Sequence, residues 1–258
     1  ANFKINPNAT LGYSDGTYYY KPDNWYHTVY NDNNLRQEYN MTLAGSTDKM
    51  NYYMSLGYLD DKGIISSSSY ERYTGRLNAD YQAKSWLKVG ANMSYSFAQM
   101  EAPSSQNDWG SSGNAFYIAD NIAPIYPIYV RNADGSFKYN DLGIQVYDTG
   151  TNTNQARKFS AGNPAIDLLL NKYNQETNYV NAKGYAIIDL PLDGLKFNTN
   201  MNISTSDNRE NNLYNPYFGS SSSTNGAASL EHYRRISLNQ QYLFTYQHDL
   251  GMHNVDLL

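Results

Sequence analysis

Residues 87–97 read Leu87-Lys88-Val89-Gly90-Ala91-Asn92-Met93-Ser94-Tyr95-Ser96-Phe97, with apolar or small residues at the odd positions and polar residues at the even ones. Successive side chains of a β-strand point to opposite faces, so this segment predicts a strand with one apolar and one hydrated surface. The pattern is typical of a transmembrane barrel strand, with lipid outside and a watery lumen inside. A soluble sandwich strand also alternates, so the choice depends on how often the pattern recurs and on the connections.

Six other segments are predicted as strands, about residues 35–44, 50–60, 70–83, 179–190, 195–206 and 233–247. Most of them alternate clearly, but 179–190 alternates poorly and its faces stay unassigned. Most run to roughly 10–14 residues, longer than the usual strand and long enough to cross a tilted barrel wall. Connections are expected to be tight after the first, third, fifth and seventh strands and long after the others. Outer-membrane barrels show that asymmetry.

The polar faces favour a barrel over a sandwich. Burial of an unpaired polar group in a dry core costs about 1–3 kcal/mol, so these faces must meet water. The side chains concerned are Asn78, Asp80, Asn92, Asn198, Asn200 and Asn202. Seven or eight such strands cannot stand alone as an open sheet, because unpaired edges are forbidden in hydrocarbon. We therefore expect an all-β fold, an antiparallel transmembrane β-barrel segment of about seven or eight strands from a larger barrel.

Composition supports this interpretation. Of the 258 residues, 17% are charged and 15% are aromatic, with 27 tyrosines. Soluble domains carry roughly 25% charged residues, and barrels concentrate Tyr and Trp at the two membrane interfaces. The net charge of -5 argues against a nucleic-acid partner, and the absence of Cys excludes disulfides and thiolate metal sites. Because the chain opens at Ala1 without a signal peptide and stops at Leu258 in an apparent new strand, we expect an internal piece of a longer protein.

Several short motifs, in the same order along nearly the whole chain, resemble the start of the barrel in SusC/RagA-type TonB-dependent transporters. They are Asn24-Trp25-Tyr26-His27, Arg36-Gln37-Glu38-Tyr39-Asn40-Met41-Thr42-Leu43-Ala44-Gly45, Asn51-Tyr52-Tyr53-Met54-Ser55-Leu56-Gly57-Tyr58, Glu71-Arg72-Tyr73, Trp86-Leu87-Lys88-Val89-Gly90-Ala91-Asn92, Asn163-Pro164 and Gly194-Leu195-Lys196-Phe197. The set is specific, although no single motif is.

The resemblance implies a 22-stranded barrel in the Gram-negative outer membrane, in contact with membrane lipid and lipopolysaccharide, of which this chain is an N-terminal part without the plug. It implies a plug and a TonB box upstream, and a SusD-like surface lipoprotein that lids the extracellular mouth. Oligosaccharides, or peptides in some members, would be captured under the lid and imported when TonB displaces the plug. On that basis the chain divides into a segment leading into the barrel (1–34), strands one to four (35–98), a long extracellular loop (99–178), strands five and six (179–206), a second extracellular loop (207–232), and strand seven with the start of an eighth (233–258).

Two other functions stay open at this point. One is a TonB-dependent receptor for a siderophore or cobalamin, which lacks a lid partner. The other is a soluble, Tyr-rich glycan-binding or adhesin sandwich. A surface lipoprotein that co-purifies with the barrel favours the SusC/RagA-type importer over the siderophore or cobalamin receptor. A monomeric chain that melts cooperatively without detergent would favour the sandwich.

No catalytic constellation is visible, so we expect neither an enzyme nor a cofactor. The four histidines, His27, His232, His248 and His253, lack metal-ligand spacing. Asp60 and Asp61 are adjacent in a strand and would point to opposite faces, which favours solvation over paired acid–base chemistry. The Asn132–Gly135 cluster is a turn signal first. Calcium bound by Asp134 with Asp141 is the alternative, although no known calcium-loop spacing is present.

Two sets of aromatic residues are candidates for function. In the long loop, residues 115–122 have helical spacing that ends at Pro124, and four rings nearby are candidates for substrate or lid-partner contact: Trp109, Tyr117, Tyr126 and Tyr129. Such rings stack on sugar rings, or alternatively pack the loop on itself and on the lid. On the strands, seven tyrosines are expected to anchor the barrel at the membrane interfaces: Tyr52, Tyr58, Tyr73, Tyr81, Tyr95, Tyr242 and Tyr246.

Overall fold

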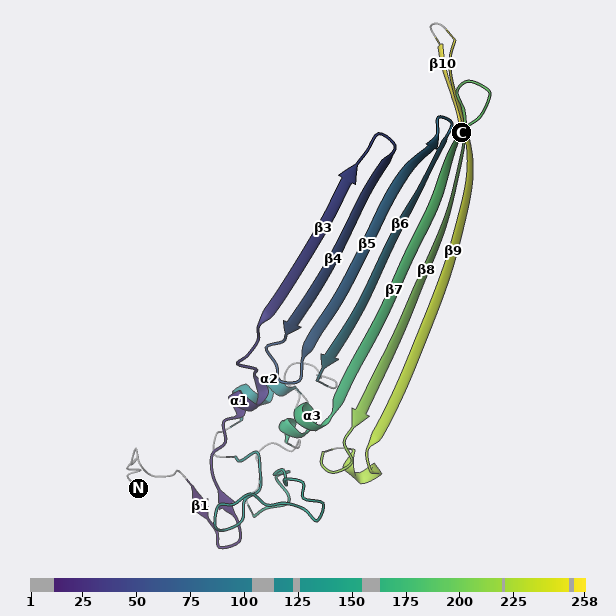
Figure 1. Cartoon of the computed structure of the whole chain (residues 1–258). Coiled ribbons are helices and arrows are strands. Elements are labelled where there is room, and N and C mark those ends of the chain that lie inside the picture. The colour runs from purple at the N-terminus through teal and green to yellow at the C-terminus, as the bar shows by residue number, and fades with distance from the viewer. Residues whose placement is uncertain (1–11, 104–113, 123–125, 155–162, 220, 251–252) are drawn as a thin grey trace.

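The computed structural model describes residues 12–103, 114–122, 126–154, 163–219, 221–250 and 253–258. Its main element is an eight-stranded antiparallel sheet in which every strand pairs with its neighbours in sequence, in the order β10-β9-β8-β7-β6-β5-β4-β3. Figure 1 shows long, nearly parallel ribbons with tight turns at one end and helices at the other. The sheet is not closed, and the all-β barrel-segment prediction is confirmed.

The strands of this sheet are β3 (Arg36–Ser46), β4 (Met50–Lys62), β5 (Ser69–Lys84), β6 (Leu87–Ala102), β7 (Lys172–Asp189), β8 (Leu195–Tyr214), β9 (Ala227–Leu250) and β10 (His253–Leu257). Several are longer than the alternation indicated. β7 begins at Lys172, and β8 and β9 extend well past the predicted strand ends toward their shared loop. The strand ends are rich in Asn, Ser and Glu and lack the apolar alternation. Backbone pairing continues there because it does not depend on side chains.

The two faces of the sheet differ as expected. Cross-strand register aligns Met41 with Leu56, and Leu77 with both Met54 and Met93, on one face, which we call the apolar face. The same register assigns β7, which the sequence left open: Ala182 pairs with Met93 and with Ile203, so its even positions belong to the apolar face. Alternate residues form the polar face.

The apolar face is exposed. Met41, Leu56, Met93 and Phe244 retain 65%, 56%, 48% and 57% of their accessible surface. A soluble sandwich would bury these side chains against a second sheet, and the only other sheet among the described residues is a two-stranded ribbon. That ribbon joins β1 (Tyr13–Ser14) to β2 (Tyr19–Tyr20). The fold therefore disfavours the sandwich alternative.

The buried core lies at one end of the sheet. Helices α1 (Trp25–Val29), α2 (Ala115–Asn121) and α3 (Pro164–Leu170) contact one another beside the β4–β5, β6–β7 and β8–β9 connections (Figure 1). The short 3₁₀ helix η1 (Ser222–Thr224) belongs to the β8–β9 connection. We call the described parts of residues 12–34, 114–154, 163–171 and 215–226 the cap. No helix among the described residues is long and apolar enough to cross a membrane.

Two clusters form the interior of the cap. Trp25, Ile128 and Ile166 are nearly fully buried in the larger cluster, and Val29 and Leu168 form the smaller one. These residues come from three separate segments of the chain. The cap is therefore held by contacts between loops that are far apart in sequence, whereas the sheet is held by its ladders.

Candidate functional site

The polar face carries two adjoining hollows in the half of the sheet nearest the cap. One, of about 580 Å³, is lined mainly by Ser, Thr and Asn with Arg72 and Arg76. The other, of about 670 Å³, is lined by serines with Tyr233 and Arg235. Tyr179 borders both. Hydroxyl, amide and guanidinium groups predominate in the lining of both hollows. Such groups can form hydrogen bonds with polar solutes.

Basic residues near the tight turns of the polar face are paired instead. Lys88 lies 3.7 Å from Asp80, and Lys196 lies 3.5 Å from Asp189. The Tyr185 hydroxyl also donates to Asp80. Its ring crosses the position that a side chain at Gly90 would occupy, so this glycine makes the contact possible. Arg76, by contrast, lines one of the two hollows of the polar face.

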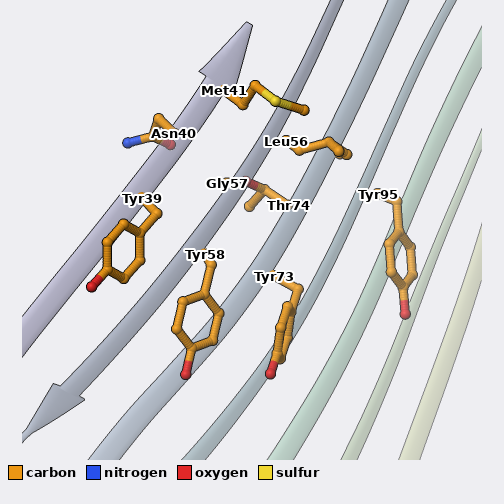
Figure 2. Close-up of a pocket in the computed structure, with 10 residues that line it drawn as sticks. Tyr39, Asn40, Met41, Leu56, Gly57, Tyr58, Tyr73, Thr74 and Tyr95 are labelled. Carbon is orange, nitrogen blue, oxygen red and sulfur yellow. The ribbon is translucent and has the colours of Figure 1, made fainter.

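Aromatic rings form a row on the apolar face at the cap end of the strands. Ring centroids are 6.4 Å apart for Tyr39 and Tyr58, 4.9 Å for Tyr58 and Tyr73, and 6.4 Å for Tyr73 and Phe97. Figure 2 shows the phenol oxygens of this row and of Tyr95 pointing the same way, with Met41 and Leu56 on the other side of the rings. We call these five rings the cap-side belt.

The hydroxyls of the cap-side belt point toward the cap. Tyr39 donates to Gln37 at 3.0 Å and Tyr73 donates to Glu71 at 2.5 Å. Each tyrosine thus directs its apolar body to the middle of the strands and its polar tip to their cap end. That is the orientation of aromatic residues at a membrane–water interface.

A second aromatic group lies at the tight-turn end of the same face. Phe197 packs against Phe244 at 4.7 Å and stacks on Tyr242 at 6.3 Å. On β5, Tyr73 and Tyr81 are eight residues apart, which is about 26 Å at 3.3 Å per residue. A barrel's apolar band is about 25 Å tall and is flanked by aromatic girdles. Tyr52, Tyr81, Tyr242 and Tyr246 lie toward the tight-turn end of the apolar face, and Tyr58, Tyr73 and Tyr95 lie nearer its cap end. Anchoring of these seven tyrosines at the membrane interfaces remains a prediction.

A buried ion pair organises the cap. Arg131 Nη2 lies 2.6 Å from Asp23 Oδ1, and these two side chains are only 7% and 15% exposed. Asp23 Oδ2 also accepts the Ile128 backbone N–H at 2.7 Å, and the guanidinium lies over the Phe137 ring at 4.8 Å. Sequence reasoning missed this pair, since more than a hundred residues separate its members and neither stands in a recognisable motif.

Asn163 joins α3 to the same loop. Its side-chain oxygen caps the helix by accepting the Ala165 N–H at 3.1 Å, with Pro164 in the first turn. Its Nδ2 group donates to the Ile128 carbonyl at 2.7 Å and to the Asp148 carbonyl at 3.1 Å. The Asn163-Pro164 motif therefore both starts α3 and fixes the position of the 126–154 loop.

The β8–β9 loop docks on this unit. Asn171 Oδ1 accepts the backbone and side-chain N–H groups of Asn215 at 2.8 and 2.9 Å. The Phe218 ring lies 5.4 Å from Tyr147, whose pKa is raised by burial. Burial likewise raises the pKa of Asp167 in α3, although the Asn171 amide donates to it at 2.8 Å. The two long loops are thus one packed body.

The structure describes the side chains of two of the four aromatic residues predicted to contact substrate or the lid partner. Tyr126 and Tyr129 pack against the larger cluster of the cap, and the Tyr126 carbonyl accepts the Trp25 indole N–H at 2.8 Å. Tyr117 belongs to α2, but its side chain and the whole of Trp109 lie outside the described residues. The positions of Tyr126 and Tyr129 agree with a packing role. Substrate or lid contact by these four residues remains a prediction.

Two of the residues considered as metal or calcium ligands, His27 and Asp134, have ordinary partners. His27 pairs with Asp32 at 2.8 Å, and Asp134 accepts the Ser136 backbone N–H at 2.9 Å beside the turn at Gly135. Hydrogen bonds from Ser136, first from its hydroxyl and then from its backbone, lower the pKa of Asp134. Within the described ranges, no group of three or more His, Asp or Glu side chains is arranged to hold a metal ion.

Comparison with curated proteins gives TonB-dependent receptors. The chain is 26% identical over 238 residues to TonB-dependent receptor P3 of Formosa agariphila, which covers 91% of this chain and 22% of that protein. It is 33% identical over 97 residues to TonB-dependent receptor P26 of the same organism, covering 38% of the chain and 9% of the relative. The chain thus spans about a fifth of the length of the first relative. No family model matches it.

Comparison with solved structures gives the same architecture. The RagAB peptide importer in its closed-closed state matches with a TM-score of 0.64 and 18% identity, over 96% of this chain and 26% of that one. The structure of the RagAB peptide transporter matches with the same score and identity over 97% of the chain. At this identity the likeness shows the fold. With the curated relatives, it confirms the resemblance to SusC/RagA-type TonB-dependent transporters seen in the sequence.

Proposed function

We propose that this chain is part of the barrel wall of an outer-membrane importer that takes up oligosaccharides or peptides in a TonB-dependent cycle. The main support is the pairing of one exposed apolar face with one hydroxyl- and amide-rich face along eight strands. A membrane barrel needs this division, with lipid against the first face and the transport lumen against the second. The cap then lies on the extracellular side, since long loops are extracellular and tight turns periplasmic.

In this proposal the chain contributes binding and translocation, and no bond in the cargo is made or broken. The hollows around Tyr179 would form part of the cargo path below the cap. Plug displacement and coupling to TonB would belong to a plug domain. The Asp80–Lys88 and Asp189–Lys196 pairs lie deeper in the lumen, where they neutralise the wall.

A SusD-like lipoprotein is the proposed lid on the cap. Solved structures of similar fold include RagAB, described as a peptide importer, which supports a two-protein assembly and peptides as one cargo class. Several apolar side chains of the cap are exposed and suit a partner surface: Tyr26, Phe137, Tyr139, Leu142 and Tyr217. A siderophore or cobalamin receptor without a lid is the alternative. Isolation of the full-length protein without a bound surface lipoprotein would favour it.

Adjacent residues on β8 offer a matched test of the lumen assignment. Ser204 lines a hollow of the polar face, whereas Ile203 lies on the apolar face and is 40% exposed. Ser204→Trp should reduce uptake of labelled oligosaccharide or peptide mixtures several-fold in cells that carry TonB, because the ring obstructs the path. Ile203→Trp should leave uptake unchanged. Equal uptake by both variants at equal surface levels, or uptake that persists without TonB, would contradict the proposal.

A further inference from the structure

The last ring of the cap-side belt is on β6. At the same level of the sheet, β7 carries an asparagine, and β8 and β9 carry charged residues. The register that aligns Tyr73 with Phe97 continues to Asn178, then Asp207 and then Arg234. All of these positions lie on the apolar face. At the level where β3 to β6 present aromatic rings, β8 and β9 therefore present an acid and a guanidinium. Two residues further toward the cap, Arg209 pairs with His232 on the same face. We call Asp207, Arg209, His232 and Arg234 the rim cluster.

The carboxylate of Asp207 holds the three basic side chains together. Arg234 Nε and His232 Nε2 lie 2.8 and 3.0 Å from Asp207 Oδ2, and Arg209 Nε lies 3.7 Å from Oδ1. Asp207 is only 16% exposed, whereas the Arg209 and Arg234 side chains are 54% and 60% exposed. The acid is thus covered by its partners, and the remaining guanidinium N–H groups face outward.

The rim cluster has surplus basic groups on its exposed side. Two permanent cations and one histidine surround a single carboxylate. Glu176 of β7 shares the face beside Arg209, on the side away from His232. No ion pair within 4 Å joins Glu176 to Arg209 among the described residues. The arginine pair is therefore neutralised by Asp207 only in part.

An apolar strip continues directly from the cluster toward the middle of the strands. Ile236 and Leu238 on β9 are 64% and 61% exposed, and Ile203 on β8 pairs with Leu238. A hollow of about 400 Å³ joins the two regions. Its lining combines both kinds of side chain: Asn178, Thr205, Asp207, Arg209, Arg234 and Ile236. Cationic donors at one end and an exposed aliphatic surface at the other match an anionic amphiphile.

We propose that the rim cluster binds the phosphorylated headgroup of a lipid in the outer leaflet. Arg209 and Arg234 would donate to the phosphate, and the acyl chains would lie along Ile203, Ile236 and Leu238. Guanidinium groups bind phosphate through paired, charge-assisted hydrogen bonds. A free phosphate ion would gain nothing from the aliphatic strip. The inference goes beyond import. It rests on two parts of the proposed function, that the apolar face meets lipid and that the cap is extracellular, and its success or failure is independent of cargo and lid.

Native mass spectrometry of the delipidated full-length protein in detergent tests this site. The probes are diphosphoryl lipid A, the same lipid without phosphates, and inorganic phosphate as a competitor. We expect the phosphorylated lipid to bind at least about tenfold more tightly than the dephosphorylated one, since charge-assisted hydrogen bonds contribute about 1.5–3 kcal/mol. The double variant Arg209→Gln/Arg234→Gln should remove most of that preference.

Arg235→Gln is the matched control, because Arg235 is the next residue on β9 and pairs with Ser206 on the polar face. It should bind the phosphorylated lipid as the unmodified protein does, and all variants should keep the unboiled electrophoretic migration of a folded barrel. Equal affinity for both lipids, or equal loss in the control, would overturn the proposal. So would complete displacement by inorganic phosphate, or a double variant that changes only the oligomeric state, which would assign the cluster to a protein contact.

Discussion

At the scale of single residues, the cap depends on an ion pair, Asp23 with Arg131, that no sequence motif indicates. Asp23 and Arg131 are buried, and Asp23 also receives the Ile128 N–H. Removal of one member of a buried ion pair leaves the other charge without compensation and costs about 3–5 kcal/mol. The 126–154 loop is positioned through this pair and through Asn163. Residues outside any motif thus decide how the cap is built.

Arg131→Met is expected to destabilise the cap by about 3–5 kcal/mol. Hydrogen exchange of the Ile128 and Val130 amides in the full-length protein would report the loss as reduced protection. Arg36→Met is the control, because Arg36 is 59% exposed in its pair with Glu38, and such a pair contributes less than about 1 kcal/mol. Unchanged protection in the Arg131 variant would show that the ion pair does not hold the loop.

Asp167 makes the stability of α3 depend on pH. Burial raises its pKa above the ordinary value of 3.8, so the folded cap disfavours the ionised form. Its contribution to stability is therefore fully present below the ordinary pKa and is lost as the pH rises through the raised value. Protection of the 166–170 amides, corrected for intrinsic exchange, should increase as the pH falls through that window. Asp167→Asn should abolish the trend, and a trend that persists in this variant would exclude Asp167 as its origin.

At the scale of elements, the sequence predicted most of the strands and which side of each strand is apolar. Alternation in 87–97 and in five of the other segments indicated both the strand and its apolar side, because a period of two is a local property of the chain. It failed for β7, where only pairing with β6 and β8 shows which side is apolar. It also missed the strand ends, where polar residues predominate on both faces. Backbone pairing continues there together with cross-strand side-chain hydrogen bonds such as Gln175 to Asn208.

Leu77 on β5 tests the apolar face directly. It lies midway between Tyr73 and Tyr81, and its neighbour Asn78 lies on the polar face. An arginine in the middle of the lipid-facing band costs about 2–4 kcal/mol, whereas one in the lumen costs little. Leu77→Arg should therefore lower the fraction of heat-modifiable, folded barrel in outer membranes, and Asn78→Arg should not. A similar yield for both variants would mean that lipid does not cover this face.

At the scale of the whole molecule, the cap joins two loops that lie far apart in the sequence. Asn171 binds Asn215, and Phe218 packs on Tyr147. Gly219 permits this approach: its φ is +82°, and an added Cβ would lie 2.9 Å from Ile166 Cγ2. The β8–β9 loop thereby closes over α3, and the surface proposed for the lid depends on that closure.

Gly219→Ala and Gly143→Ala form a matched pair for this docking. Both glycines have positive φ, so each alanine carries a similar backbone cost of about 1–2 kcal/mol. Only Gly219 faces a neighbour, since nothing lies within 4 Å of a Cβ at Gly143. Gly219→Ala should therefore make residues 215–226 much more sensitive to protease and reduce recovery of any lid partner. Equal sensitivity of the two variants would show that the loops do not depend on this contact.

That the chain forms a series of long strands with one apolar and one polar side follows from its amino-acid sequence, because alternation is a relation between neighbouring residues. The tertiary structure alone decided which residues form the cap, since Asp23, Arg131, Asn163 and Asn215 meet only when distant segments pack. It also decided that aromatic rings and the rim cluster share one level of the apolar face. Those relations arise from the register between strands, which no single segment encodes.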